Sequence, residues 1–133
     1  MHRAKLRVAT PRHPRTMQIQ TILNRLQKQP GFVYGKASLH QRPGGRFRLD
    51  VEVRARKGSR GVCSNCMKRR PTYDHQPQRA FQFVPIWGIV VFLLCAPRRV
   101  ECPKCGVKVE LLPWCDGKHQ LTTTFAWFLA SWA

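Results

Sequence analysis

An alternation of apolar and charged side chains over residues 46–56 is the clearest pattern in the chain. In a β-strand, side chains two residues apart lie on the same face, so this pattern predicts a strand with one apolar and one charged face. A second strand-like run, from Phe32 to Leu39, precedes it, and Pro43-Gly44-Gly45 lies between the two runs. Because proline and glycine favour turns, we expect a β-hairpin. Its charged face carries four arginines: Arg46, Arg48, Arg54 and Arg56.

Apolar residues recur at helical spacing in two segments. The first segment, residues 17–29, is predicted to be a helix that Pro30-Gly31 stops, and its apolar face consists of Ile19, Ile22, Leu23 and Leu26. The second helix is predicted to begin at one of the residues 122–124, whose threonines are suitable caps. Its apolar residues are Phe125, Phe128, Leu129 and Trp132. This pattern is still running at Ala133, so we expect the start of a longer helical region that could associate with a second copy of the chain.

The run from Phe83 to Pro97 contains no charged side chain. It is shorter than the roughly 20 residues that span a bilayer, so a membrane partner is not expected. Instead the run predicts paired strands over residues 80–84 and 89–95, with a turn at residues 85–88. Further strands are expected over residues 98–102 and 107–112.

Two Cys-x-x-Cys motifs supply the candidate chemistry. The first is Cys63-Ser64-Asn65-Cys66 and the second is Cys102-Pro103-Lys104-Cys105. Each spacing lets one tight turn direct two thiolates at one ion, so the four cysteines predict a tetrahedral zinc site. Because all four ligand positions are filled, the Zn²⁺ would be structural. The two motifs differ in one respect, since Gly106 follows the second and Met67 follows the first.

Other uses of the cysteines stay open at this level. A set of three cysteines and one histidine would also suit zinc, and it consists of Cys102, Cys105, Cys115 and His119. Two disulfides, or two unrelated pairs of reduced thiols, are further alternatives. The N-terminal residues lead into no apolar core, so no signal peptide is predicted. In an intracellular chain, paired Cys-x-x-Cys motifs favour metal over disulfides.

The chain is strongly basic, with 24 Lys and Arg against 6 Asp and Glu, a net charge of +18. Residues 1–70 hold 18 basic and 2 acidic residues, hence +16 of that charge. A balance of this kind favours a polyanionic partner, and we expect DNA. The residues predicted to contact phosphates are the four arginines of the hairpin together with Arg69, Arg70, Arg98 and Arg99. Part of the cluster at residues 68–70 could instead offset the charge of the thiolates.

Carboxylates are few and scattered. The six are Asp50, Glu52, Asp74, Glu101, Glu110 and Asp116, and no spacing among them suggests a catalytic metal site. The chain is therefore predicted not to be an enzyme. A small enzyme, and a zinc module that binds RNA or protein, remain as alternative classes.

The segment from Arg98 to Glu110, followed by Pro113-Trp114, resembles the N-terminal region of insertion-sequence transposases of the ISL-three family. Residues 83–88 and 117–124 are similar too, and the resemblance runs from Met17 to Ala133. It implies a zinc finger on the four cysteines of the two motifs, then a helix-turn-helix region, then a catalytic domain. It also implies recognition of terminal inverted repeats and a place at the bacterial nucleoid in the cytoplasm. We expect the chain to be a truncated, non-catalytic piece of such a transposase.

The predicted fold class is α+β: a small antiparallel zinc ribbon with an N-terminal helix and hairpin and a C-terminal helix that starts a helix-turn-helix region. Four segments are expected. Residues 1–16 would be a basic disordered tail, and residues 17–60 the helix and hairpin. Residues 61–115 would form the zinc ribbon, and residues 116–133 the truncated helical region.

Overall fold

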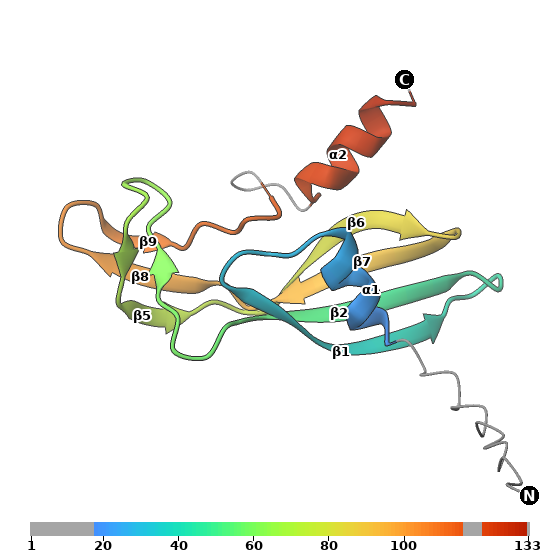
Figure 1. The fold of residues 1–133 in the computed structure, drawn as a ribbon, viewed down its shortest axis with the longest axis horizontal. Helices are drawn as coiled ribbons and strands as arrows, with labels where there is room; N and C mark the ends of the chain where they lie inside the picture. Colours follow the sequence, from blue (N-terminus) through green and yellow to red (C-terminus); the bar gives the residue numbers. More distant parts are fainter. Residues whose placement is uncertain (1–17, 116–120, 133) are drawn as a thin grey trace, which may run out of the picture.

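A computed structural model of the chain describes residues 18–115 and 121–132 (Figure 1). Within these residues the fold is mostly β, with nine strands arranged in three sheets and only two short helices. The predicted α+β zinc ribbon with a helix-turn-helix start is therefore wrong as a fold class. Most of the predicted strands and helices exist, but their assembly differs. The predicted tail at residues 1–16 lies outside the described residues.

A four-stranded sheet forms the body of the molecule (Figure 1). Its order is β1 (Phe32–Gln41), β2 (Phe47–Ala55), β7 (Ile89–Cys95) and β6 (Arg79–Ile86). β1 and β2 form one antiparallel hairpin, and β6 and β7 form another. Both hairpins were predicted. The two are joined because β2 and β7 run side by side in parallel.

The parallel pair is the physical reason for the different fold class. The sequence interpretation placed residues 79–95 in the same ribbon as the cysteine motifs, whereas β6 and β7 extend the sheet of the first hairpin. A strand in the middle of a sheet reads as a nearly continuous apolar run, as β7 does with the sequence IVVFLLC. An alternating pattern assigns side chains to the two faces of a sheet, but it does not identify the neighbouring strand in that sheet.

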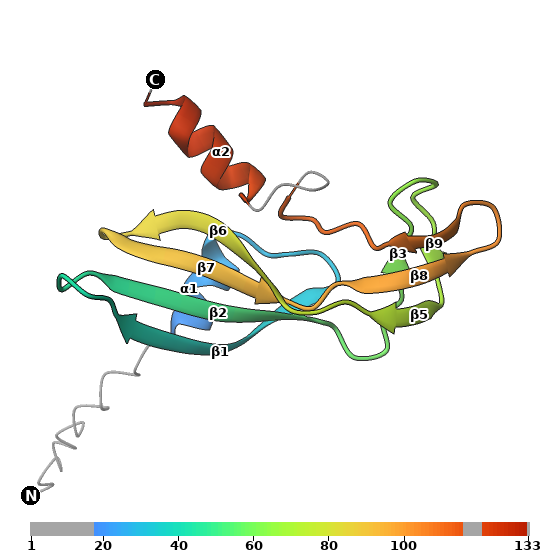
Figure 2. The same ribbon diagram turned by 180° about the vertical axis from the view of Figure 1, so that it is seen from behind.

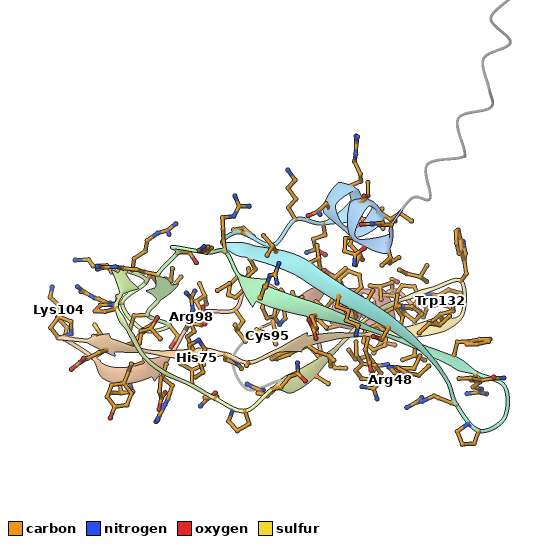
Figure 3. The ribbon with its side chains drawn as sticks, turned by 90° about the horizontal axis from the view of Figure 1, so that it is seen from below. Arg48, His75, Cys95, Arg98, Lys104 and Trp132 are labelled. Atoms are coloured by element: carbon orange, nitrogen blue, oxygen red, sulfur yellow. The ribbon has the colours of Figure 1, made fainter. Side chains whose placement is uncertain are left out.

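The remaining strands form two small sheets at one end of the molecule (Figure 2). β3 (Gly61–Val62) pairs with β4 (Arg69–Arg70), and β8 (Arg98–Cys102) lies between β5 (Thr72–His75) and β9 (Gly106–Val109). An isolated bridge joins Cys63 to Glu110 and links the two small sheets. In Figure 3, Lys104, which lies between the two cysteines of the second Cys-x-x-Cys motif, marks this end of the molecule. We call it the knuckle end, after the turns that the two motifs form.

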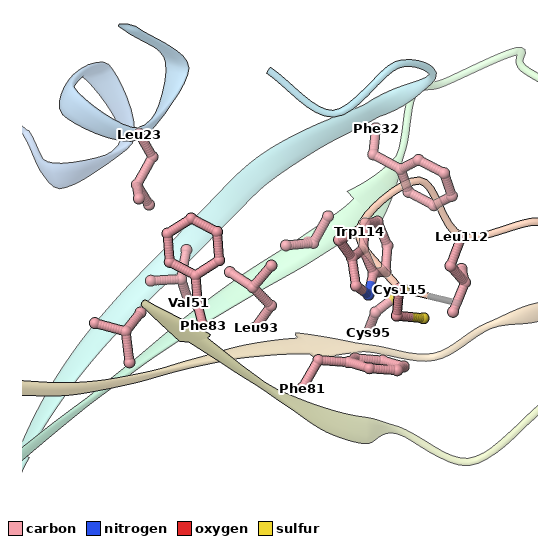
Figure 4. Close-up of a cluster of buried hydrophobic side chains, with 12 residues drawn as sticks. Leu23, Phe32, Val51, Phe81, Phe83, Leu93, Cys95, Leu112, Trp114 and Cys115 are labelled. Atoms are coloured by element: carbon pink, nitrogen blue, oxygen red, sulfur yellow. The ribbon is translucent and has the colours of Figure 1, made fainter. Parts of the chain in front are cut away.

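The hydrophobic core lies on one face of the four-stranded sheet (Figure 4). Trp114 belongs to this core and is only 1% exposed. Its ring makes edge contacts with Phe32 and Phe81, at ring-centroid distances of 4.9 and 5.7 Å. Leu23 from α1 (Ile19–Leu26) enters the same cluster. The first helix was thus predicted correctly in kind. It ends earlier than expected, at Leu26, where the N–H of Gln27 donates to the Leu23 carbonyl.

The second helix, α2 (Thr123–Ala130), begins as predicted. The Thr122 hydroxyl accepts a hydrogen bond from the Phe125 N–H at 3.2 Å, which caps the helix. Phe125 is buried, whereas Trp127 and Trp132 are 74% and 77% exposed. The predicted self-association through this helix therefore has apolar side chains available and stays a prediction. In the part of the chain that the structure describes, no helix is long and apolar enough to span a membrane.

Candidate metal centre

The sulfur atoms of Cys63, Cys66, Cys102 and Cys105 all lie within 4.8 Å of one another. The Cys66 and Cys102 sulfurs, one from each motif, are 3.6 Å apart. Four thiolates around one ion at about 2.3 Å have sulfur separations of roughly 3.8 Å in a tetrahedron. The cluster therefore has the ligands and the size to hold a metal ion, as predicted from the paired motifs.

Each motif forms a backbone turn of the same shape, which we call a knuckle. In the first, the Met67 N–H donates to the Cys63 carbonyl at 2.9 Å, and the Cys63 N–H donates to the Lys68 carbonyl at 2.8 Å. Met67 has φ of 63° and Gly106 has φ of 77°, so both residues after the second cysteine are in the left-handed region. The sequence difference between the knuckles is thus not a difference in backbone shape. Met67 adopts at some energetic cost a conformation that glycine adopts freely.

Backbone amides favour the ionised state of the thiols. The N–H groups of Cys66 and Asn65 lower the pKa of Cys63. Burial raises the pKa of Cys102, but the N–H groups of Lys104 and Cys105 and its neighbouring thiols outweigh burial and bring it to about 6. At Cys105 the Asn65 amide lowers the pKa, but burial and the Cys102 and Cys63 thiols outweigh it, so the pKa is raised. Metal ligation requires the thiolate, which the backbone amides therefore favour at Cys63 and Cys102.

Polar side chains surround the four sulfurs. The Asn65 amide, from the first knuckle, donates to the Cys105 sulfur of the second at 3.2 Å. The Cys66 and Cys102 thiols raise the pKa of the nearby Arg70 guanidinium, Cys66 more than Cys102, while the buried Nε of Arg70 has no hydrogen-bond partner among the described residues. Four thiolates on a divalent ion leave a net charge of about −2, which Arg70 partly offsets. Arg70 thus lies close to the sulfur cluster, and its contact with DNA stays a prediction, while Lys68 and Arg69 are exposed.

Arg98 also has a role other than the predicted one. It is 7% exposed, and its guanidinium forms two hydrogen bonds with the Glu110 carboxylate, at 2.9 and 3.0 Å. It also donates to the Ser59 carbonyl at 2.8 Å. Its side chain is covered and bound to Glu110, and the contact of Arg98 with phosphate stays a prediction. The alternation of β8 gave no sign that an acid twelve residues further along would lie opposite it.

The other predicted arginines fall into two groups. Arg99 makes a two-point ion pair with Asp74, which lowers the pKa of that carboxyl. Arg48 bonds to Asp50 at 2.7 Å and lies 4.0 Å from the centre of the Phe92 ring. Among the arginines predicted to contact phosphates, those that are exposed and form no ion pair with the described residues are Arg46, Arg54, Arg56 and Arg69. These four are free for a polyanion.

Sequence reasoning missed a basic cleft between α1 and the first hairpin. Its volume is about 640 Å³, and its cations are Arg25, Lys28 and Arg56. No carboxylate is among the described residues that line it. Arg25 and Lys28 are close in sequence at the end of α1, and Arg56 follows β2, so no local charge run indicated that the three share a cleft. A second hollow, beside the second knuckle, contains Arg60, Arg69 and Arg70 together with Glu101.

The remaining cysteines lie elsewhere. Cys95 and Cys115 are buried in the core of the four-stranded sheet, and burial raises the pKa of Cys95 to about 12. Cys115 is therefore not with Cys102 in the described cluster, which favours the four-cysteine set over the set that includes His119. His119 itself lies outside the described residues. None of the four clustered cysteines forms a disulfide.

Comparisons with protein-family models, curated proteins and solved structures found no match to this chain. The resemblance to ISL-three transposases, drawn from the sequence, therefore stays a prediction. The cysteine cluster and the basic surfaces are what support a function.

Proposed function

We propose that this chain is a DNA-binding module whose knuckle end is held together by one structural Zn²⁺ ion. The close approach of the four cysteine sulfurs carries the proposal. Zinc is favoured over harder cations because all four ligands are thiolates, and over a catalytic role because a four-coordinate site has no open position for water.

The basic surfaces support DNA as the partner. The net charge is +18, and cations without carboxylate partners lie in the described parts of α1, the first hairpin and the first knuckle. Cations distributed over several elements suit a phosphate backbone better than a single small anion. The resemblance to ISL-three transposases makes the terminal inverted repeats of a transposon the natural probe. We assign no cleavage activity to the chain, since Asp50, Asp74 and Glu110 pair with arginines.

Metal content and salt-dependent binding test the proposal together. The purified chain should contain one zinc ion by native mass spectrometry, and Cys63→Ser should lose it. Cys95→Ala is the matched control, because Cys95 is buried outside the cluster and should leave the zinc in place. Affinity for an inverted-repeat duplex should fall steeply with salt, because neutralised phosphates release counterions. Zinc retained by Cys63→Ser, or tighter binding to RNA than to any duplex DNA, would contradict the proposal.

A further inference from the structure

Trp87 sits in the two-residue turn between β6 and β7 in a conformation that is unfavourable for a tryptophan. Its φ is 48° and that of Gly88 is 75°, so both turn residues are in the left-handed region. Turns of this kind favour Asn, Asp or Gly, and a bulky residue with positive φ is an outlier. The side chain is also 93% exposed. Packing of the ring against the protein does not offset the unfavourable backbone conformation, because the ring is exposed. A strained and exposed tryptophan therefore indicates a role in binding and not in folding.

The turn of the other hairpin is at the same end of the sheet as Trp87. β2 and β7 are parallel, with Arg48 opposite Val90. Arg46 and Gly88, which immediately precede β2 and β7, therefore lie at the same end of the sheet. Figure 1 shows both turns at the end of the molecule opposite the small sheets. Arg42 and Arg46 are exposed at the first turn and form no ion pair among the described residues.

This end combines an exposed aromatic ring with two cations that form no ion pair among the described residues, whereas the exposed Tyr73 at the other end lies beside Arg99, which pairs with Asp74. Neither turn contains an acidic residue, since their sequences are RPGGR and IWGI. The exposed Trp127 of α2 has no cation on its own helix, because α2 contains no charged residue. A flat aromatic ring stacks on nucleic acid bases, and nearby arginines bind the adjoining phosphates. Stacking is available only to a base that is unpaired or at a frayed end, because bases inside a duplex are covered by their neighbours.

We propose that the two hairpin turns form a DNA contact in which Trp87 stacks on an unpaired base while Arg42 and Arg46 bind the neighbouring phosphates. This inference rests on the proposed DNA-binding function and adds a site and a substrate class to it. The strain at Trp87 is then retained because the turn holds the ring clear of the sheet.

Trp87→Asn tests the inference because it should change stability and binding in opposite directions. Asparagine suits positive φ, so the melting temperature should rise by about 4 °C. Affinity for a single-stranded oligonucleotide should fall by about 5-fold or more, since stacking of one base is worth roughly 5- to 150-fold. Trp87→Phe should keep most of the affinity. The matched control is Trp132→Asn, which removes another exposed tryptophan, just after α2, and should leave affinity unchanged.

Arginine variants and a fully paired probe complete the test. Arg42→Ala and Arg46→Ala should each reduce the slope of log affinity against log salt by about 1. A covalently closed circular duplex, which has no ends and no unpaired bases, should lose less affinity than a single strand on Trp87→Asn. Single-strand affinity unchanged in Trp87→Asn overturns this inference while leaving the proposed function intact. If the unmodified chain binds no DNA even at low salt, both are overturned.

Discussion

The two ends of this molecule both consist of β-strands, but they are stabilised by different forces. Twelve buried residues form the core beside the four-stranded sheet, and helix α1 and Trp114 close it. At the knuckle end the buried cluster consists of Cys63, Val100 and Cys102, so only one of its three residues is not a cysteine. The sheet can exclude water with hydrocarbon, whereas the knuckle end depends on what its sulfurs bind.

The Arg98–Glu110 pair adds a polar element to the knuckle end. Both side chains are almost fully buried, and their hydrogen bonds hold the start of β8 to the end of β9 and to the loop at Ser59. Gly61 fits between Val100 and Glu110, where a Cβ atom would approach Val100 to 2.7 Å. The small strands are thus held by close backbone packing and a buried charge pair, because there is too little apolar area for a core.

Removal of the proposed zinc ion should have the largest effect and should destabilise the knuckle end alone. Structural zinc contributes about 10–16 kcal/mol to the folding of small zinc-finger peptides, so chelation should unfold the knuckle end. In hydrogen exchange followed by mass spectrometry, residues 61–70 and 98–110 should lose protection with EDTA, while β1, β2, β6 and β7 keep it. Equal loss of protection in both regions would show that they fold as one unit.

Glu110→Ala should have the next largest effect. It leaves the buried Arg98 guanidinium without its partner, which costs about 3–5 kcal/mol. Urea denaturation of the zinc-bound chain, with Cys66 and Cys102 still ligated, would measure it. The double variant Arg98→Met with Glu110→Leu should recover much of the loss, because no unpaired charge is then buried. A loss from Glu110→Ala below 1 kcal/mol would mean that the pair is open to water.

Leu93→Ala is the corresponding change in the sheet. Leu93 is fully buried in the centre of β7, and leucine-to-alanine changes in cores cost about 2–5 kcal/mol. Here the sheet should unfold at lower urea concentration while the chain still retains its zinc. Loss of zinc at the same urea concentration as loss of the sheet would contradict the independence of the two ends.

Met67→Gly should have the smallest effect, and in the stabilising direction. Relief of the left-handed strain gains about 1–2 kcal/mol, and the extra freedom of glycine in the unfolded chain costs about 0.5–1 kcal/mol. The net gain is therefore about 0.5–1 kcal/mol, measurable as a higher urea midpoint for the knuckle end. Gly106→Ala, the reverse change in the second knuckle, should destabilise, and an opposite sign in either variant would contradict the equivalence of the two turns.

The sequence was most informative where a local pattern decides the structure. Spacings of a few residues were enough to predict three features. These are the strand at residues 46–56, the cap at Thr122 and the two cysteine pairs of the cluster. The parallel contact between β2 and β7 joins segments about forty residues apart, and neither strand carries a signal for the other. The same limit explains Arg98, whose charge looked like a surface feature until its partner Glu110 was placed beside it.

Capture of a metal ion by two knuckles requires a loop to close, and the β6–β7 hairpin shortens that loop. Residues 67–101 separate the two motifs along the chain. The hairpin pairs Arg79 with Cys95, so its own residues no longer count toward the loop. The loop that remains to be closed consists of residues 67–78 and 96–101. Closure entropy changes by only about 0.6 kcal/mol for each halving of a loop, so the gain in affinity is small. A loop of about ten residues closes within roughly 10–100 ns, so arrival of the ion at the first knuckle would set the rate of capture.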